Sequence, residues 1–69
     1  MPAPDKTALV VLATGAEEME VSIIVDILRR GGVKVTLAGL AGSAAVNCSR
    51  GLRVVPDVAL GDVAGSFDA

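Results

Sequence analysis

The stretch that decides the fold runs from Thr7 to Gly39 and reads TALVVLATGAEEMEVSIIVDILRRGGVKVTLAG. It opens with an unbroken apolar run, residues 7–13, which is typical of a strand covered on both faces in a parallel sheet. Residues 17–30 then show helical periodicity, with acidic residues in the first turn, arginines in the last turn and two glycines at the stop. Residues 33–39 alternate like a second strand. Strand, helix and strand with short connections predict a right-handed βαβ unit with parallel strands.

The remaining segments carry weaker patterns. Residues 1–5 read as a flexible arm, residues 6–39 form the βαβ unit, and residues 44–56 predict a hairpin that ends at a proline. Residues 57–69 predict a short helix and then the start of a further strand. Because two parallel strands with one helix leave a sheet face uncovered, we expect the chain to be an N-terminal fragment of a single α/β domain.

Composition and charge exclude several classes of function. A chain of 69 residues hides only about 60% of its unfolded surface, so marginal stability is expected. Cys48 is the only cysteine and the chain has no histidine, which excludes an intrachain disulfide and a structural zinc site. A net charge of −2 argues against binding to a nucleic-acid backbone. Because no apolar run is long enough for a membrane span or a signal peptide, we expect a cytoplasmic protein.

Glu20 is the residue whose position needs an explanation. Glutamates suit the first turn of a helix, because a helix N-terminus attracts negative charge. Helical geometry nevertheless places Glu20 among apolar positions, beside Ile23, Ile24 and Ile27, whereas Glu18 falls on the solvated arc. We therefore expect the Glu20 carboxylate to face inward, at the sheet edge where open α/β folds bind their ligands.

Two interpretations of Glu20 stay open from the residues alone. A buried carboxyl with a raised pKa could donate a hydrogen bond to an anion or act as a general acid or base. Alternatively, Glu20 bends back and caps free backbone N–H groups of the first helical turn. A phosphate or dinucleotide site is disfavoured, because ATGAEE lacks the G-x-G-x-x-G spacing and its glutamates would repel a pyrophosphate.

Several motifs together resemble one family. The segments ALVVLATGAEEMEVSIIVDILRRGGVKVTLAGLAG and VNCSRGLRVVPDVAL are similar to the N-terminal third of the Parkinsonism-associated deglycase (DJ-one) family, in the ThiJ/PfpI superfamily. GAEEME, D-x-L-R-R-x-G and V-x-CSR carry the resemblance. It implies a flavodoxin-like (Rossmann-like) three-layer α/β sandwich that forms a homodimer, to which this chain contributes the N-terminal βαβ unit and the hairpin.

The resemblance also implies a site. Glu20 would hydrogen-bond a nucleophilic cysteine that this chain lacks, so a second polypeptide carrying the rest of the domain would have to supply it. Gly15 and Glu17 would line the same pocket. Arg30 and Arg50 would lie at the interface or reach the site from the partner subunit. Cys48, the cysteine that this chain does contain, would be a secondary redox residue. The site would need neither metal nor cofactor.

The activity implied for the complete protein is that of a glyoxalase or protein deglycase. Its substrates would be small 2-oxoaldehydes or glycated adducts, and it would respond to oxidative stress in the cytoplasm, with the nucleus and mitochondrion also open. No membrane partner is expected. This chain alone should be inactive. Two alternatives stay open: a redox sensor and chaperone without catalysis, and a plain structural βαβ fragment in which Glu20 is only a helix cap.

Overall fold

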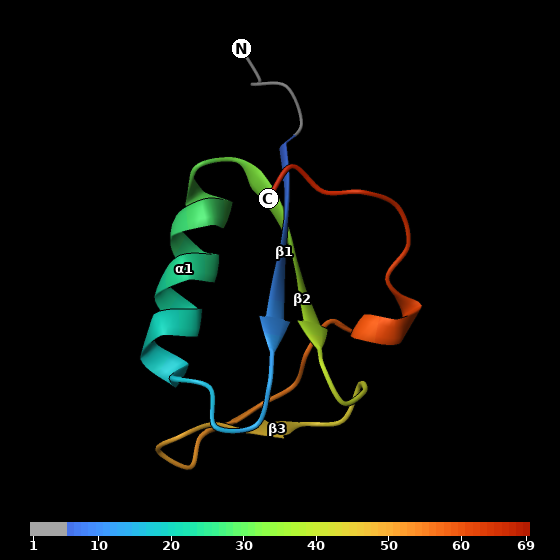
Figure 1. Ribbon diagram of the computed structural model, residues 1–69. Coiled ribbons are helices and arrows are strands. Elements are labelled where there is room, and N and C mark those ends of the chain that lie inside the picture. The colour runs from blue at the N-terminus through green and yellow to red at the C-terminus, as the bar shows by residue number, and fades with distance from the viewer. Residues whose placement is uncertain (1–5) are drawn as a thin grey trace.

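The computed structural model describes residues 6–69, so the arm expected over residues 1–5 lies outside the described residues (Figure 1). Strand β1 (Lys6–Leu12), helix α1 (Glu18–Arg30) and strand β2 (Val33–Gly39) follow one another along the chain. The two strands pair in parallel over their full length, from Lys6 opposite Val33 to Leu12 opposite Gly39. The predicted βαβ unit is thereby confirmed.

Helix α1 begins and ends where local chemistry favours it. The Glu17 side chain caps the start, because its Oε1 accepts a hydrogen bond of 2.7 Å from the Met19 backbone N–H. At the other end the Gly31 N–H donates to the Ile27 carbonyl over 3.0 Å, and Gly32 follows with a positive φ of 87°. Acidic residues in the first turn and arginines in the last complement the helix dipole.

The second half of the chain contains the predicted hairpin and a strand that was not predicted. Strands β3 (Val46–Asn47) and β4 (Arg53–Val54) pair antiparallel, which confirms the hairpin. Strand β5 (Val58–Ala59) then pairs in parallel with the end of β2. Within residues 57–69 helical structure is confined to the 3-10 turn η1 (Leu60–Asp62). The short helix expected in this segment is thus a single 3-10 turn that follows β5.

Side-chain and backbone bonds from Asp57 explain why the segment joins the sheet. The Asp57 N–H donates to the Leu37 carbonyl over 2.8 Å, and the Asp57 carboxylate accepts from the Leu37 N–H at 2.9 Å. These two bonds hold the chain against the edge of β2 just before β5 begins. Tertiary pairing thus overrides the weak local helical pattern.

The last residues of the chain lie along the other edge of β1. The N–H groups of Asp68 and Ala69 donate to the Thr7 carbonyl at 3.1 and 3.2 Å, and the Leu9 N–H donates to the Ala69 carbonyl at 2.8 Å. The Asp68 carboxylate also accepts from the Thr7 N–H at 2.8 Å. In Figure 1 the C-terminus accordingly lies next to β1.

One face of the sheet packs against α1 and forms the core. The buried cluster consists of Leu12, Leu37, Val46 and Cys48, with Val21 and Val25 of α1 packed against it. Because side chains alternate along a strand, the neighbours of Leu12 in β1 project to the opposite face. Val11 is one of them, and it is 45% exposed. The sheet therefore has one covered face and one that solvent reaches.

Candidate functional site

Helix α1 carries two apolar stripes, and only one of them faces the sheet. Val21, Val25 and Leu28 are half-buried on the sheet side. Four side chains form what we call the outer apolar strip, with exposed fractions between 49% and 68%: Met19, Ile23, Ile24 and Ile27. Residues 6–69 leave the side chains of this strip about half or more exposed to solvent.

Glu20 lies on this outer side and is exposed. The expectation that it faces the interior is therefore wrong for this chain, although its predicted isoleucine neighbours share its side of the helix. The physical reason is the packing of α1 through Val21 and Val25, which lie about 100–140° around the helix from Glu20. Among residues 6–69 the Glu20 carboxylate has no hydrogen-bond partner, and the glutamate that caps the helix is Glu17.

The loop between β1 and α1 joins the start of the helix to the hairpin. Gly15 has a positive φ of 86°, which glycine adopts at little cost, and its N–H donates to the Asn47 carbonyl at 2.9 Å. The Ser49 N–H donates to the Ala16 carbonyl, also at 2.9 Å. Glu17 is half-buried and directly follows the loop residues that make these two bonds. The structure thus places Gly15 and Glu17 next to the first turn of α1.

Glu18 is the residue whose importance the sequence did not indicate. Its carboxylate is half-buried and accepts hydrogen bonds from the hairpin turn: Oε1 from the Ser49 hydroxyl at 3.1 Å, both oxygens from the Arg50 N–H at 3.1 Å, and Oε2 from the Leu52 N–H at 3.2 Å. The pKa of Glu18 lies below its usual value. The causes are hydrogen bonding to its own backbone N–H first, and then the bonds from Arg50, Leu52 and Ser49, which outweigh desolvation.

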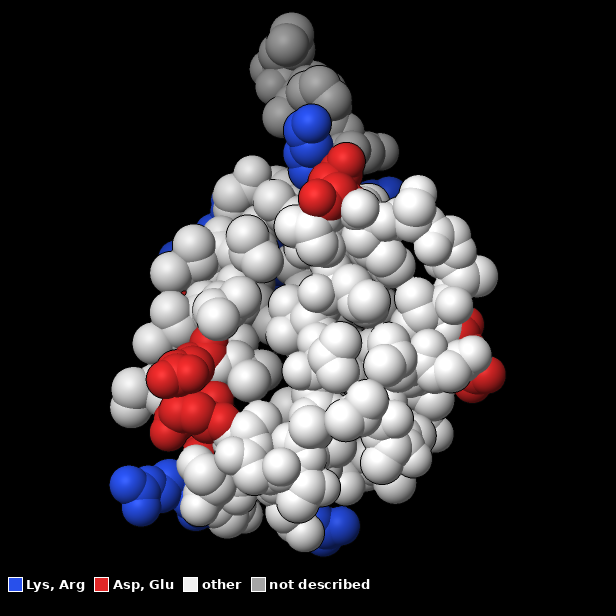
Figure 2. All heavy atoms as spheres, viewed as in Figure 1, with Lys and Arg blue, Asp and Glu red and all other residues white. Residues whose placement is uncertain are grey.

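The two candidate arginines, Arg50 and Arg30, bond to other acidic residues of α1 and not to Glu20. Arg50 is exposed on the hairpin turn, and its backbone is bound to Glu18. Figure 2 shows acidic side chains over the first half of α1 and basic side chains beyond them toward the hairpin. Arg30 ends the helix about 15 Å from Glu20 along the axis, and its Nε pairs with Asp26 at 3.0 Å. Its 79% exposed side chain is free to contact another protein surface.

Cys48 is buried in the core cluster, with 6% of its surface exposed. Desolvation raises the pKa of its thiol, and the negative charges of Glu18 and Glu17 raise it further. Both effects disfavour the thiolate, which is the reactive form. In this environment Cys48 behaves as a core residue.

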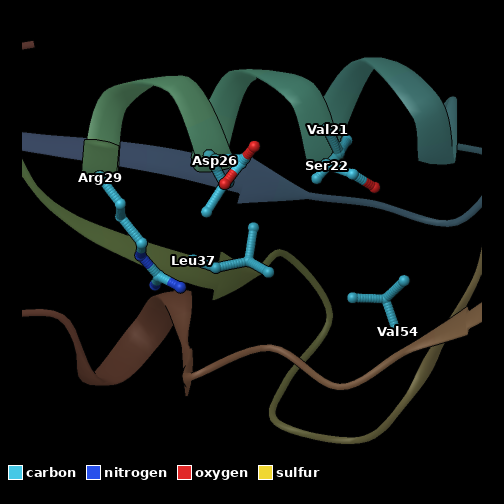
Figure 3. Close-up of a pocket in the computed structure, with 7 residues that line it drawn as sticks. Val21, Ser22, Asp26, Arg29, Leu37 and Val54 are labelled. Atoms are coloured by element: carbon cyan, nitrogen blue, oxygen red, sulfur yellow. The ribbon is translucent and has the colours of Figure 1, made fainter. Parts of the chain in front are cut away.

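A groove lies on the sheet side of α1 and does not include Glu20. It encloses about 260 Å³ and is lined by Val21, Ser22, Val25, Asp26, Arg29, Leu37 and Val54. In Figure 3 the Arg29 side chain reaches from the helix across to β2. There its guanidinium donates to the Val35 carbonyl at 3.1 Å and contacts Asp57 at 3.2 Å. These bonds tie the end of α1 to the sheet, so Arg29 has a structural role.

Metal binding and membrane insertion find no support in the described part of the chain. Residues 6–69 contain no group of three His, Cys, Asp or Glu side chains that could hold a metal ion. None of the helices formed by these residues has the length and apolar character that crossing a bilayer requires.

Comparison with known proteins gives consistent matches over most of the chain. The Parkinson disease protein 7 homolog of Danio rerio is 58% identical over 57 residues, and the glutathione-independent glyoxalase DJR-1.2 of Caenorhabditis elegans is 48% identical over 62 residues. These alignments cover 83% and 88% of this chain but only 30% and 33% of the relatives. The chain thus spans about a third of the length of the curated relatives it matches.

Solved structures agree with the sequence matches. The crystal structure of Drosophila melanogaster DJ-1beta superposes with a TM-score of 0.85 at 57% identity, and the match covers 87% of this chain and 32% of that chain. The flavodoxin-like α/β fold class is thereby confirmed, with the βαβ unit and hairpin as this chain's part of it. The family model described as DJ-1/PfpI matches residues 6–69. Both comparisons confirm the resemblance read from the motifs, and the chain belongs to the DJ-1/PfpI family.

Proposed function

We propose that this chain is the N-terminal part of a cysteine-dependent glyoxalase or protein deglycase, and that Glu20 is the residue it contributes to the reacting centre. The observation that carries the proposal is the placement of Glu20. It is an exposed carboxylate in the first turn of α1, beyond the carboxyl ends of parallel strands, without a partner among residues 6–69. Open α/β sheets bind their ligands at this edge. The similarity to a glyoxalase of Caenorhabditis elegans supports the class of reaction.

The outer apolar strip supplies the environment that this chemistry requires. Apolar surfaces of this kind mark interaction sites. A second polypeptide that covers the strip would exclude water from Glu20 and could bring a cysteine within its reach. A hydrogen bond from the Glu20 carboxyl to the cysteine sulfur would favour the thiolate over the thiol.

The reaction of a 2-oxoaldehyde at such a cysteine can be written in three balanced steps. The thiolate adds to the aldehyde carbon, and the oxygen of that carbonyl takes up a proton. The hydrogen on this carbon is then transferred, as a proton, to the neighbouring carbonyl carbon. The hydroxyl proton passes to the oxygen of that neighbouring carbonyl, and the first carbon regains its C=O bond, which leaves a thioester of a 2-hydroxy acid. Water finally hydrolyses the thioester and releases the hydroxy acid and the thiol. A carboxyl beside the sulfur is suited to move the protons in these steps.

The other candidate residues take supporting roles in this proposal. Gly15 and Glu17 line the pocket around the cysteine, because they lie at the end of the loop between β1 and α1, beside the first turn of the helix. Arg50 approaches the site from the partner subunit of a homodimer, and Arg30 lies at the interface between subunits. The burial of Cys48 and the raised pKa of its thiol argue against the secondary redox role that the resemblance implies. We place the protein in the cytoplasm, where it responds to oxidative stress.

The proposal is tested by substituting Glu20 in the protein assembled with the polypeptide that carries the cysteine. Mass spectrometry of the isolated protein identifies that companion. Consumption of methylglyoxal measures activity, and the pH dependence of cysteine alkylation gives the thiol pKa. Glu20→Leu should abolish most activity and raise the thiol pKa, whereas Glu20→Gln should have a smaller effect. The control Asp62→Asn removes an exposed carboxylate from η1, away from the site, and should change neither quantity.

Three outcomes would contradict the proposal in different ways. A protein without a companion or a nucleophilic cysteine excludes the cysteine mechanism. Unchanged activity and thiol pKa in Glu20→Leu reduce Glu20 to a structural residue. A thiol whose oxidation depends on Glu20 in a protein without methylglyoxal turnover favours a redox sensor over an enzyme.

A further inference from the structure

We propose that Glu18 is a positioning residue: its carboxylate holds the hairpin turn that carries Arg50 against the loop that carries Gly15 and Glu17. In the proposed homodimer it thereby fixes the point from which Arg50 reaches the site of the partner subunit. The inference rests on the proposed function, because Arg50 is the residue through which Glu18 acts on the substrate. It extends that function by assigning a role to a side chain on the opposite side of the helix from Glu20.

The contacts of Glu18 are those of a clamp on the turn. Its two carboxylate oxygens accept from the Ser49 hydroxyl and from the backbone N–H groups of Arg50 and Leu52, at 3.1 to 3.2 Å. The turn itself is closed by the Gly51 N–H bonded to the Cys48 carbonyl at 3.0 Å. A carboxylate can accept several such bonds at once, and bonds to an ionised acceptor are stronger than neutral ones.

The bonds from Glu18 add to a set of backbone hydrogen bonds that joins the loop between β1 and α1 to the hairpin. Backbone bonds of 2.9 Å from Gly15 to Asn47 and from Ser49 to Ala16 form the first part of this set. Glu18 adds the part that reaches the far side of the turn, at Leu52. Glu17 is already used as the helix cap, so it is not available for this role.

The consequence for Arg50 follows from its place in the turn. Its side chain is exposed and long, but its backbone N–H is bonded to both oxygens of Glu18. The bonds to Glu18 therefore fix the backbone position from which the Arg50 side chain extends into solvent. In the proposed homodimer the Arg50 cation reaches the partner subunit's site and binds the carbonyl oxygens of a 2-oxoaldehyde or the carboxylate of the hydroxy acid. Losing this fixed position should weaken substrate binding and leave the thiol chemistry unchanged.

The experiment compares Glu18→Ala and Glu18→Gln with Arg50→Ala in the assembled protein, using methylglyoxal as the substrate. Misplacing a contact by about 1 Å can cost on the order of 100-fold, so Glu18→Ala should lower kcat/KM by roughly 10- to 100-fold, mainly through KM. Glu18→Gln keeps one acceptor oxygen and should lose less. The control Asp62→Asn removes an exposed carboxylate from η1 with the same change of charge, and it should leave kcat and KM unchanged.

A double-substitution cycle separates positioning from a general loss of structure. If Glu18 acts through Arg50, adding Glu18→Ala to Arg50→Ala should cause little further loss, whereas independent effects would multiply. The thiol pKa should stay at its wild-type value in every Glu18 variant. Additive losses, or a thiol pKa shifted as in Glu20→Leu, would overturn the inference.

Amide hydrogen exchange tests the bonds between Glu18 and the hairpin turn independently of any enzyme activity. The amides of Arg50 and Leu52 should exchange at least several-fold faster in Glu18→Ala than in the wild type, while the Leu9 amide in β1 keeps its protection. If the wild type does not turn over methylglyoxal, the proposed function fails and exchange alone decides whether the clamp exists. Unchanged exchange at Arg50 and Leu52 would overturn the clamp even in an active enzyme.

Discussion

Truncating adjacent residues of β1 tests which face of the sheet forms the core. Leu12 is fully buried against α1, whereas Val11 is 45% exposed on the opposite face. Leu12→Ala removes buried atoms and leaves a cavity, which costs about 2–5 kcal/mol. Val11→Ala removes two methyl groups that are roughly half-buried, and at about 0.8 kcal/mol for each fully buried group this costs about 0.8 kcal/mol. The two substitutions should therefore differ several-fold.

Urea unfolding followed by circular dichroism measures this difference. A chain of 69 residues has a free energy of unfolding of about 3–10 kcal/mol, so Leu12→Ala removes a large part of it. With a slope of about 1 kcal/mol per molar urea, the midpoint should fall by about 2–5 M for Leu12→Ala and by about 1 M or less for Val11→Ala. Equal losses would refute the assignment of the open face, because they would mean that Val11 is covered in solution.

Three further predictions concern a glycine, acid stability and thiol reactivity. Gly39→Ala would drive its Cβ into a backbone carbonyl oxygen three residues further on and should prevent folding, whereas Gly61→Ala meets open space and should be tolerated; equal urea midpoints would contradict this. Folding lowers the pKa of Glu18 and Asp68, so both stabilise the fold above their unfolded-state pKa values and lose that effect as pH falls through the folded-state values. The urea midpoint should accordingly decrease on acidification, and a constant midpoint would count against these shifts. Cys48 should react slowly with an aromatic disulfide reagent at neutral pH and rapidly in urea, because burial raises its pKa; equal rates would show that it is exposed.

Local signals account for the parts of the fold that could be predicted. The apolar strand, the acidic helix start and the glycine stop are properties of adjacent residues, and each of them lies where the pattern predicted. Strand β5 was missed because it has only two residues and exists through contacts of Asp57 with Leu37. The hairpin strands β3 and β4 are equally short, but they pair with each other across a glycine and end at a proline, which the sequence shows. The partner of β5 is β2, which lies much earlier in the chain.

The sequence likewise predicted only those features of the candidate site that depend on neighbouring residues of the helix. The apolar arc of α1 is wide enough to contain two surfaces, and a helical projection does not tell which one meets the sheet. Glu20 was therefore placed among the correct neighbours but on the wrong side for this chain. Glu18 bonds to residues 31 to 34 positions further along the chain, and no spacing rule connects such positions. Its partners became visible only through the tertiary structure.

The bonds between Thr7 and Asp68 make the folded chain a non-covalent ring. The two residues are 61 positions apart, and their side chains and backbones hold each other at the edge of β1. Closing a loop costs entropy that grows only slowly with its length, so a few bonds can hold such a large ring. Asp68 and Ala69 depend on these bonds for their place, whereas Thr7 is also held by the pairing of β1 with β2. Breaking the bonds at Asp68 should therefore release the last residues of the chain while β1 stays in the sheet.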